Sequence, residues 1–130
     1  MKVLVVDDST MIRMILKGVL KQLNLVDVHE ALDGNAALVK LSEGGFGLML
    51  LDLHMPGMSG LTLLEQVKTM DQHKDMPVII ISSDTDTETL ALAQQHGASA
   101  IIKKPFKVEG LREALQGACP HALEVSERKI

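Results

Sequence analysis

Five short aliphatic runs recur along the chain and limit what it can fold into. They are Val3–Val6, Val26–His29, Leu48–Leu51, Val78–Ile81 and Ala100–Ile102. Short runs of mostly Val, Leu and Ile are typical of strands that are buried on both faces. The segments between these runs are longer, so each of them has room for a helix.

The clearest helical pattern follows the first run. Its apolar residues fall on one helical face: Ile12, Ile15, Leu16, Val19, Leu20 and Leu23. Further helices are predicted at Asn35–Leu41, Leu61–Met70, Thr87–His96 and Val108–Cys119. Parallel strands need crossover connections, and helices commonly supply them. The alternation therefore predicts an α/β fold with a five-stranded parallel sheet and helices on both faces.

Composition excludes several classes of protein. The chain has 130 residues, 46% of them apolar, which suits one folded domain with a core of its own. A net charge of −4 argues against nucleic acid as the main partner. The single cysteine, Cys119, forms no internal disulfide and fits a reducing compartment. No run approaches the length of a membrane span or a signal peptide, so we expect a cytoplasmic protein with no membrane contact.

Polar side chains follow four of the five predicted strands. Asp7 and Asp8 come after the first, Asp52 after the third, Ser82 after the fourth and Lys104 after the fifth. Ligands of open parallel sheets bind beyond the carboxyl ends of the strands. We therefore expect three carboxylates, a hydroxyl and an ammonium group at one edge of the sheet.

This combination indicates phosphoryl chemistry that depends on a divalent ion. Clustered carboxylates raise one another's pKa unless a cation is present, and Mg²⁺ prefers such oxygen ligands. Aspartate is a known nucleophile toward phosphoryl groups. Mg²⁺, Lys104 and the Ser82 hydroxyl could neutralise a phosphoryl group on Asp52. The alternative is structural: Asp7 and Asp8 could form only a strand-end turn, with Asp8 or Ser9 capping the first helix.

Over about residues 1–118 the chain resembles the receiver domain of two-component response regulators. The matching pieces occur in order: VVDD, ALDGNAAL, LLDLHMPGMSG, PVIIISS, GAS and KKPF. The resemblance implies a flavodoxin-like sheet with strand order 2-1-3-4-5. Residues 119–130 lie beyond it and are expected to be a tail or an extension of the last helix.

The resemblance also assigns a metal site. It implies that Mg²⁺ is bound by Asp7, Asp8, Asp52 and the main-chain carbonyl of His54. Asp8 is expected to bind the ion directly, and Asp7 partly through water.

The phosphoryl site follows from the same resemblance. Asp52 is the expected phosphoacceptor, Ser82 is expected to bond a phosphoryl oxygen, and Lys104 is expected to pair with the phosphoryl group. The family has a cis peptide bond after this lysine, which implies a cis Lys104–Pro105 bond. His54 and Asp84 occupy the two positions that flank the phosphoryl group in this family.

One position departs from the family pattern. Many receivers carry Tyr or Phe three residues before the motif lysine, where the ring moves together with the Ser or Thr. Here the pair of switch positions is Ser82 and Ile101, and Ile101 has no ring to turn. We expect the signal to be carried by loop and helix movement, or to be weakly coupled.

The expected output is binding, not turnover of a substrate. An aspartate-dependent phosphatase would place its acids as Asp-x-Asp after the first strand, but here Asp7 and Asp8 are adjacent. The receiver is expected to catalyse only its own phosphorylation and dephosphorylation.

The resemblance also implies the partners. They are a sensor histidine kinase or histidine phosphotransfer domain, and a downstream protein that docks on the fourth helix, fifth strand and fifth helix. A chemotaxis-type regulator, a phosphorelay intermediate and a receiver fragment of a larger regulator all remain open.

The pattern along the chain predicts the location of two further residue types. The eight methionines are predicted to fill gaps in a core that has few aromatic rings. Four histidines show no metal-binding spacing and are predicted to lie at the surface: His29, His73, His96 and His121.

Overall fold

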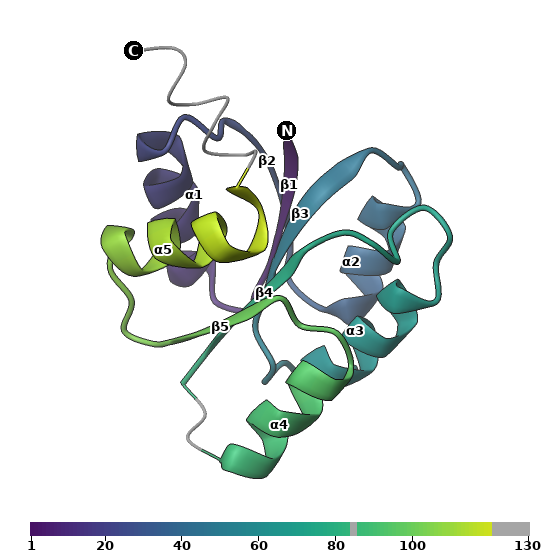
Figure 1. The fold of residues 1–130 in the computed structure, drawn as a ribbon. Helices are drawn as coiled ribbons and strands as arrows, with labels where there is room; N and C mark the ends of the chain where they lie inside the picture. The colour runs from purple at the N-terminus through teal and green to yellow at the C-terminus, as the bar shows by residue number, and fades with distance from the viewer. Residues whose placement is uncertain (84–85, 121–130) are drawn as a thin grey trace.

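The computed structural model describes residues 1–83 and 86–120 and confirms the predicted α/β fold. Its strands are β1 (Lys2–Val6), β2 (Asp27–Ala31), β3 (Phe46–Leu51), β4 (Val78–Ser82) and β5 (Ala100–Lys103). They form one parallel sheet in the order β2-β1-β3-β4-β5, as the resemblance implied (Figure 1). Two segments named above, Asp84 and the tail from His121, lie outside the described residues.

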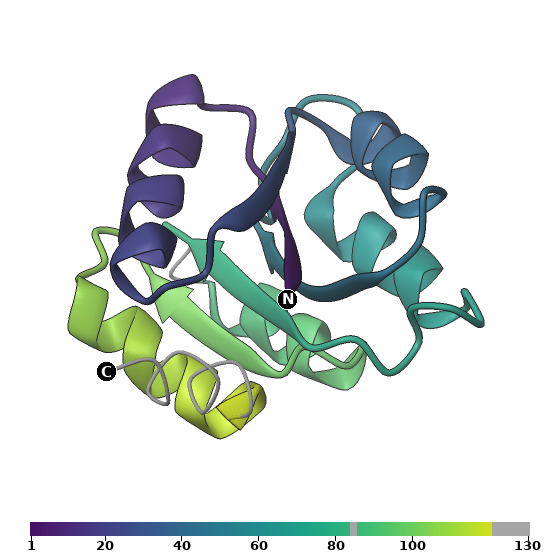
Figure 2. The same cartoon turned by 90° about the horizontal axis from the view of Figure 1, so that it is seen from above.

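Helices cover both faces of the sheet. They are α1 (Thr10–Gln22), α2 (Gly34–Leu41), α3 (Gly60–Lys68), α4 (Thr87–Gln95) and α5 (Val108–Ala118). Helices α1 and α5 pack on one face, and α2, α3 and α4 pack on the other (Figures 1 and 2). In the described part of the chain, no helix is long and apolar enough to cross a membrane.

The sheet is buried on both sides, which explains why its strands read as unbroken apolar runs. In β1, Val3 and Val5 point toward α1 and α5, while Leu4 and Val6 point toward the other helices. All four are at most 1% exposed. Burial of one such side chain contributes about 2 kcal/mol, so the strand ends are held by a well-packed core.

Capping residues start the helices at the carboxyl edge of the sheet. Ser9 Oγ accepts a hydrogen bond from the Ile12 amide at 3.2 Å, and Asp33 Oδ1 accepts one from the Ala36 amide at 2.8 Å. Ser9 is therefore the cap of α1. Because the cap is Ser9, the side chain of Asp8 is not needed for that purpose.

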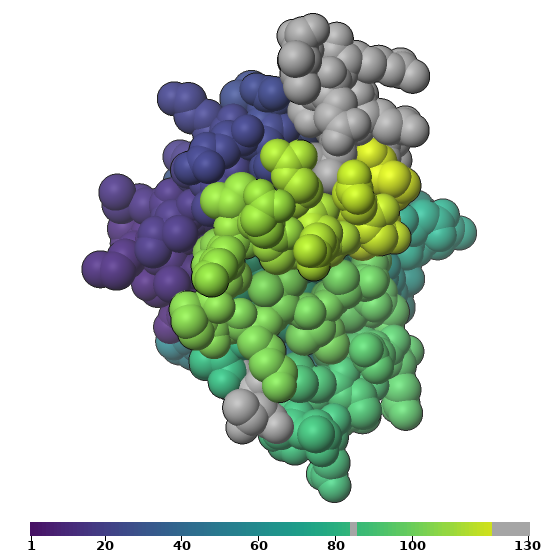
Figure 3. Space-filling view, turned by 60° about the vertical axis from the view of Figure 1, so that its left-hand side comes forward, coloured from purple at the N-terminus to yellow at the C-terminus, as the bar shows by residue number. Residues whose placement is uncertain are grey.

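Strand β5 is an edge strand with a helix on each of its faces. Figure 3 shows α5 across the middle of this side of the molecule, with α1 on one side of it and α4 below. The side chains of Leu92 on α4 and Lys103 on β5 are exposed. This side of the fold therefore presents α4, β5 and α5 together.

The prediction for the methionines was wrong at three positions, because Met1, Met11 and Met14 are exposed. Met49 is buried, and Met55 and Met58 pack against the core, but Met11 and Met14 are 69% and 66% exposed. Both lie on the outer side of α1, because the buried stripe of that helix is narrow and consists of Leu16, Val19 and Leu20.

The prediction for the histidines was wrong at His73. Its side chain is 1% exposed and lies against Phe46, with 6.3 Å between the ring centroids. Neither ring nitrogen has a hydrogen-bond partner in the described structure. Burial, helped by the charge of Lys2, holds the pKa of His73 below its usual value. His73 is therefore a neutral core residue.

Protonation of His73 should lower the free energy of unfolding in mild acid. With a lowered pKa in the folded state, the unfolded chain binds the proton more tightly, so stability falls as the pH drops below about 6.5. His73→Leu should remove this part of the slope, which amounts to at most about 1.4 kcal/mol per pH unit. The measurement is urea unfolding followed by circular dichroism between about pH 7.5 and pH 5.

The matched control is His54→Gln, which removes one exposed imidazole. If His73→Leu and the wild type lose stability equally over this range, the neutral assignment of His73 is wrong.

Candidate functional site

Neighbouring strands bring the three acids together. Val6 at the end of β1 is paired with Leu51 at the end of β3, and the Asp52 amide donates to the Val6 carbonyl at 2.9 Å. One carboxylate oxygen from each of Asp7, Asp8 and Asp52 lies within 4.8 Å of the others. The expected acidic cluster is therefore present.

Two of the three acids are almost removed from solvent. Asp7 is 1% exposed and Asp52 is 6% exposed, whereas Asp8 is exposed. Asp7 Oδ1 accepts a hydrogen bond from the Ser9 amide at 2.9 Å. The cluster thus has a buried floor formed by Asp7 and Asp52 and an open side at Asp8.

Lys104 reaches this cluster from the carboxyl end of β5, the strand at the edge of the sheet. Its Nζ lies 3.0 Å from Asp7 Oδ2 and 3.8 Å from Asp52 Oδ2. The peptide bond between Lys104 and Pro105 is cis, which confirms that prediction. The ammonium group forms its closer contact with Asp7, a pairing that the sequence analysis did not anticipate.

Charge crowding acts on Asp52 in particular. Burial raises the pKa of Asp52, and the charges of Asp7 and Asp8 raise it further. The charge of Lys104 and the His54 amide, which donates to Asp52 Oδ1 at 3.3 Å, lower the pKa but do not cancel the rise. The ionised form of Asp52 is therefore costly in the protein alone.

Gly60 lets the loop after β3 turn back against Asp52. A Cβ atom at this position would overlap the main-chain carbonyl oxygen of Asp52 and lie 2.6 Å from Leu53 Cα. The Gly60 amide donates to the Leu53 carbonyl at 2.9 Å. A residue with a side chain would push α3 away from the loop that carries Asp52. Gly60 therefore allows α3 to pack closely against this loop.

The remaining predicted site residues are Ser82 on β4, His54 in the loop after β3 and Ile101 on β5. Ser82 ends β4, is 1% exposed and accepts a hydrogen bond at its carbonyl from the Lys104 amide at 2.9 Å. His54 is exposed, two residues beyond Asp52. Ile101 lies on β5 opposite Ile80 and packs, half-buried, against the core on the α4 side of the sheet.

Arg13 is a residue that the sequence analysis missed. Its Nη1 donates to the main-chain carbonyl of Asp7 at 2.6 Å, and its Nε donates to Glu30 at 3.1 Å. The available signal was an arginine one helical turn after the cap, on the helix that follows the acidic pair. That signal does not reveal the contact with β2, which depends on the tertiary fold.

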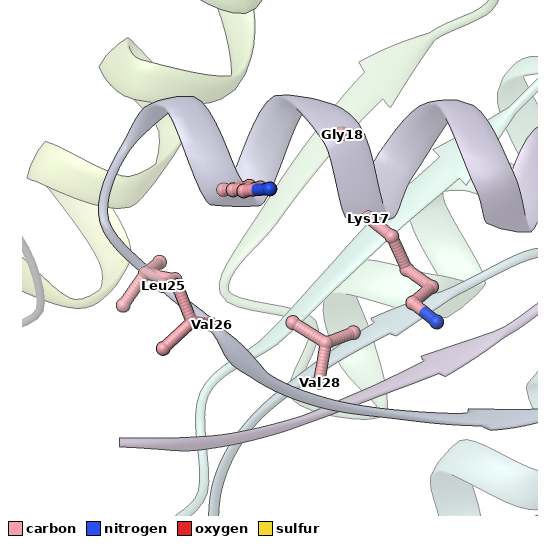
Figure 4. A pocket seen from close by; sticks show the side chains of 6 residues that line it. Lys17, Gly18, Leu25, Val26 and Val28 are labelled. Atoms are coloured by element: carbon pink, nitrogen blue, oxygen red, sulfur yellow. The ribbon is translucent and has the colours of Figure 1, made fainter.

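A groove between α1 and the start of β2 is separate from this site (Figure 4). Its volume is about 330 Å³, and its lining includes Lys17, Lys21 and Val26. Because β2 begins at Asp27, the groove lies toward the amino ends of the strands. The acidic cluster is at the opposite edge, so the two sites share no residues.

The acidic cluster fits a hard divalent ion. All of its donors are carboxylate oxygens, which Mg²⁺ prefers. The nearby cation, Lys104, supplies one positive charge against three carboxylates. Crowding of this kind is relieved by an ion with oxygen ligands, so the residues present fit the expected cofactor.

Comparison with known proteins agrees with this arrangement. The sequence model of the response regulator receiver domain matches residues 3–116. The chain is 34% identical over 116 residues to chemotaxis protein CheY of Pseudomonas aeruginosa, covering 89% of this chain and 94% of the relative. It is 37% identical over 115 residues to chemotaxis protein CheY-3 of Vibrio cholerae, with 88% of each chain covered.

Solved structures give the same result. Vibrio cholerae chemotaxis protein CheY4 superimposes with a TM-score of 0.82 at 33% identity, covering 88% of this chain and 95% of that one. The receiver domain of NtrX from Brucella abortus superimposes with a TM-score of 0.80 at 34% identity, covering 95% and 98%. The chain therefore belongs to the family of response regulator receiver domains.

Proposed function

We propose that this receiver accepts a phosphoryl group from a histidine kinase onto Asp52, in a step that requires Mg²⁺, and signals through altered binding of a partner. The observation that carries the proposal is the position of Asp52. Its buried carboxylate lies within 4.8 Å of two further acids, with Lys104 Nζ 3.8 Å from its Oδ2. A nucleophile, ligands for an ion and a cation for the phosphoryl oxygens are thus within reach of one another.

The ligands for Mg²⁺ would be Asp7, Asp8, Asp52 and the main-chain carbonyl of His54. Bound Mg²⁺ supplies positive charge that offsets the phosphoryl oxygens and the crowded acids. Asp8, on the open side of the cluster, is suited to direct binding. The buried Asp7 is already engaged by Lys104 and by the Ser9 amide, which suits a less direct role.

Asp52 is the nucleophile in this proposal. One of its carboxylate oxygens attacks phosphorus, and the bond from phosphorus to the histidine nitrogen of the donor breaks, leaving its electron pair on that nitrogen. Lys104 then pairs with the phosphoryl group, and the Ser82 hydroxyl donates to a phosphoryl oxygen. The hydrogen bond from the Lys104 amide to the Ser82 carbonyl keeps these two residues side by side.

The output in this proposal is binding at the face formed by α4, β5 and α5 (Figure 3). Ser82 lies two residues beyond Ile80, which is paired with Ile101 on β5. A shift at Ser82 can therefore reach β5 and the packing of Ile101 against the core on the α4 side of the sheet. Helix α4 also carries an exposed apolar side chain, Leu92.

A chemotaxis-type partner is favoured, since the curated relatives above carry chemotaxis names and are covered over most of their length. A phosphorelay intermediate, which passes its phosphoryl group to a histidine phosphotransfer domain, is the second candidate. Ile101 favours it, because a relay does not need an aromatic switch. In either role the protein would work in the cytoplasm, and its catalysis would be limited to its own phosphorylation and dephosphorylation.

Phosphorylation by a small donor tests the chemistry. With acetyl phosphate and Mg²⁺, the wild type should gain one phosphoryl group by intact-mass measurement, because Asp52 is the nucleophile. Asp52→Asn should gain none, and removal of Mg²⁺ with a chelator should prevent the gain in the wild type.

The matched control is Asp71→Asn, an exposed acid outside the cluster, which should be modified like the wild type. If the wild type stays unmodified with Mg²⁺ present, or if Asp52→Asn is modified equally, the proposal is wrong.

Charge crowding predicts a second result, on stability without metal. Asp52→Asn should raise the melting temperature of the metal-free protein by roughly 3–5 °C, about 1 kcal/mol in a domain of this size, because it removes one of the crowded charges. The folded protein binds a proton at Asp52 more tightly than the unfolded chain does, so the gain should shrink as the pH falls toward the raised pKa.

Thermal unfolding with and without Mg²⁺ checks this prediction, with Asp71→Asn again as the control. Mg²⁺ should stabilise the wild type more than it stabilises Asp52→Asn. A lower melting temperature for metal-free Asp52→Asn would contradict the repulsion on which the prediction depends.

A further inference from the structure

Arg13 contacts three different groups beside the acidic cluster. Its Nη1 donates to the Asp7 carbonyl at 2.6 Å, its Nε to Glu30 Oε1 at 3.1 Å and its Nη2 to Thr10 Oγ1 at 3.2 Å. The side chain is 13% exposed. An arginine held by contacts in several directions is fixed in position, which a single lysine contact would not achieve.

The carbonyl that Arg13 binds belongs to the peptide that joins Asp7 to Asp8. It lies between the end of β1 and the start of α1, outside both hydrogen-bond ladders. The Asp7 amide donates to the Ala31 carbonyl, whereas the Asp7 carbonyl accepts from Arg13, so different partners hold the amide and the carbonyl of this residue. Within the described residues, Arg13 is the donor that satisfies this carbonyl. The orientation of the peptide sets the directions in which the two acidic side chains leave the main chain.

Glu30 anchors the guanidinium from the neighbouring strand. It lies on β2 opposite Val5 and also accepts a hydrogen bond from Lys17 Nζ at 3.2 Å. Burial raises the pKa of Glu30, but the hydrogen bonds and charges of Lys17 and Arg13 outweigh burial and hold that pKa below its usual value. Glu30 is therefore ionised at neutral pH and pairs with Arg13 by charge as well as by geometry.

We propose that Arg13 is a positioning residue for the divalent-ion site: anchored by Glu30, it fixes the Asp7–Asp8 peptide so that both carboxylates are directed toward Mg²⁺ before the ion binds. The inference rests on the function proposed above, since it assumes that the acidic cluster binds Mg²⁺. It goes further by assigning part of the ion's affinity to a side chain that does not touch the ion. Partners of this indirect kind commonly contribute about tenfold or more to metal affinity.

Calorimetric titration of Mg²⁺ into the protein, with no phosphodonor present, tests the role of Arg13. Arg13→Gln should weaken Mg²⁺ binding about tenfold. The matched control is Lys17→Gln, which removes the other cation bound to Glu30, one turn further along α1, without touching Asp7. Its Mg²⁺ affinity should stay within about twofold of the wild type, even if its melting temperature falls.

The rate of phosphorylation by acetyl phosphate gives a second readout. For Arg13→Gln the rate at low Mg²⁺ should drop, and at saturating Mg²⁺ it should return close to the wild-type rate, because the variant changes the placement of the ligands and leaves the nucleophile intact. A deficit that persists at saturation would overturn the positioning role.

The binding results separate this inference from the proposed function. Wild-type affinity in Arg13→Gln, or equal weakening in Arg13→Gln and Lys17→Gln, would overturn the role of Arg13 alone. Failure of the wild type to bind Mg²⁺ would overturn the proposed function itself. Should Arg13→Gln not fold, Arg13→Lys replaces it: one ammonium cannot bind Glu30 and the Asp7 carbonyl with the same geometry. Weakened Mg²⁺ binding in that variant supports the proposal, and unchanged binding overturns it.

Discussion

Three carboxylates within 4.8 Å of one another are the constraint on which the site depends. Two of them, Asp7 and Asp52, are nearly buried, so water screens their repulsion poorly. Within the described structure, Lys104 is the one cation that contacts the carboxylate groups of these residues, and it lies closer to Asp7 than to Asp52. The protein alone leaves the cluster with an excess of negative charge. A divalent ion would relieve this repulsion, and the ionisation of Asp52 would then depend on whether the ion is bound.

The fold maintains this unfavourable arrangement through packing elsewhere. The strands that carry the acids are central to the sheet, and their side chains are buried against helices on both faces. Gly60 allows α3 to begin against the loop after Asp52, and Ser9 caps α1 directly after the acidic pair. Each strand end is thus held by a helix that starts close by. The free energy gained in the core offsets the repulsion at the edge.

Much of this arrangement could be predicted from the sequence. The apolar runs located all five strands to within two residues at either end. The positions that follow them include Asp7, Asp52 and Lys104, whose side chains the structure brings together. This succeeded because a parallel sheet places all of its carboxyl ends at one edge. The strand order and the cis bond before Pro105 came from the family resemblance and agree with the structure.

The errors concern contacts that the local pattern does not determine. His73 is polar, but it is buried against Phe46, a residue 27 positions earlier in the chain. Met11 and Met14 share a helix with core residues, yet the width of the buried stripe depends on how α1 meets its neighbours. The contact of Arg13 with Glu30 joins α1 to β2 and appears only once the sheet has formed. Sequence periodicity predicts elements, whereas these contacts depend on how the elements pack.

The most direct test of the central claim is a crystal structure grown with Mn²⁺ in place of Mg²⁺, with the ion located by anomalous scattering. Mn²⁺ accepts the same oxygen ligands. The account predicts one well-occupied peak among the carboxylates of Asp7, Asp8 and Asp52. An anomalous map without a peak at this cluster, or with its dominant peak elsewhere on the protein, would contradict it.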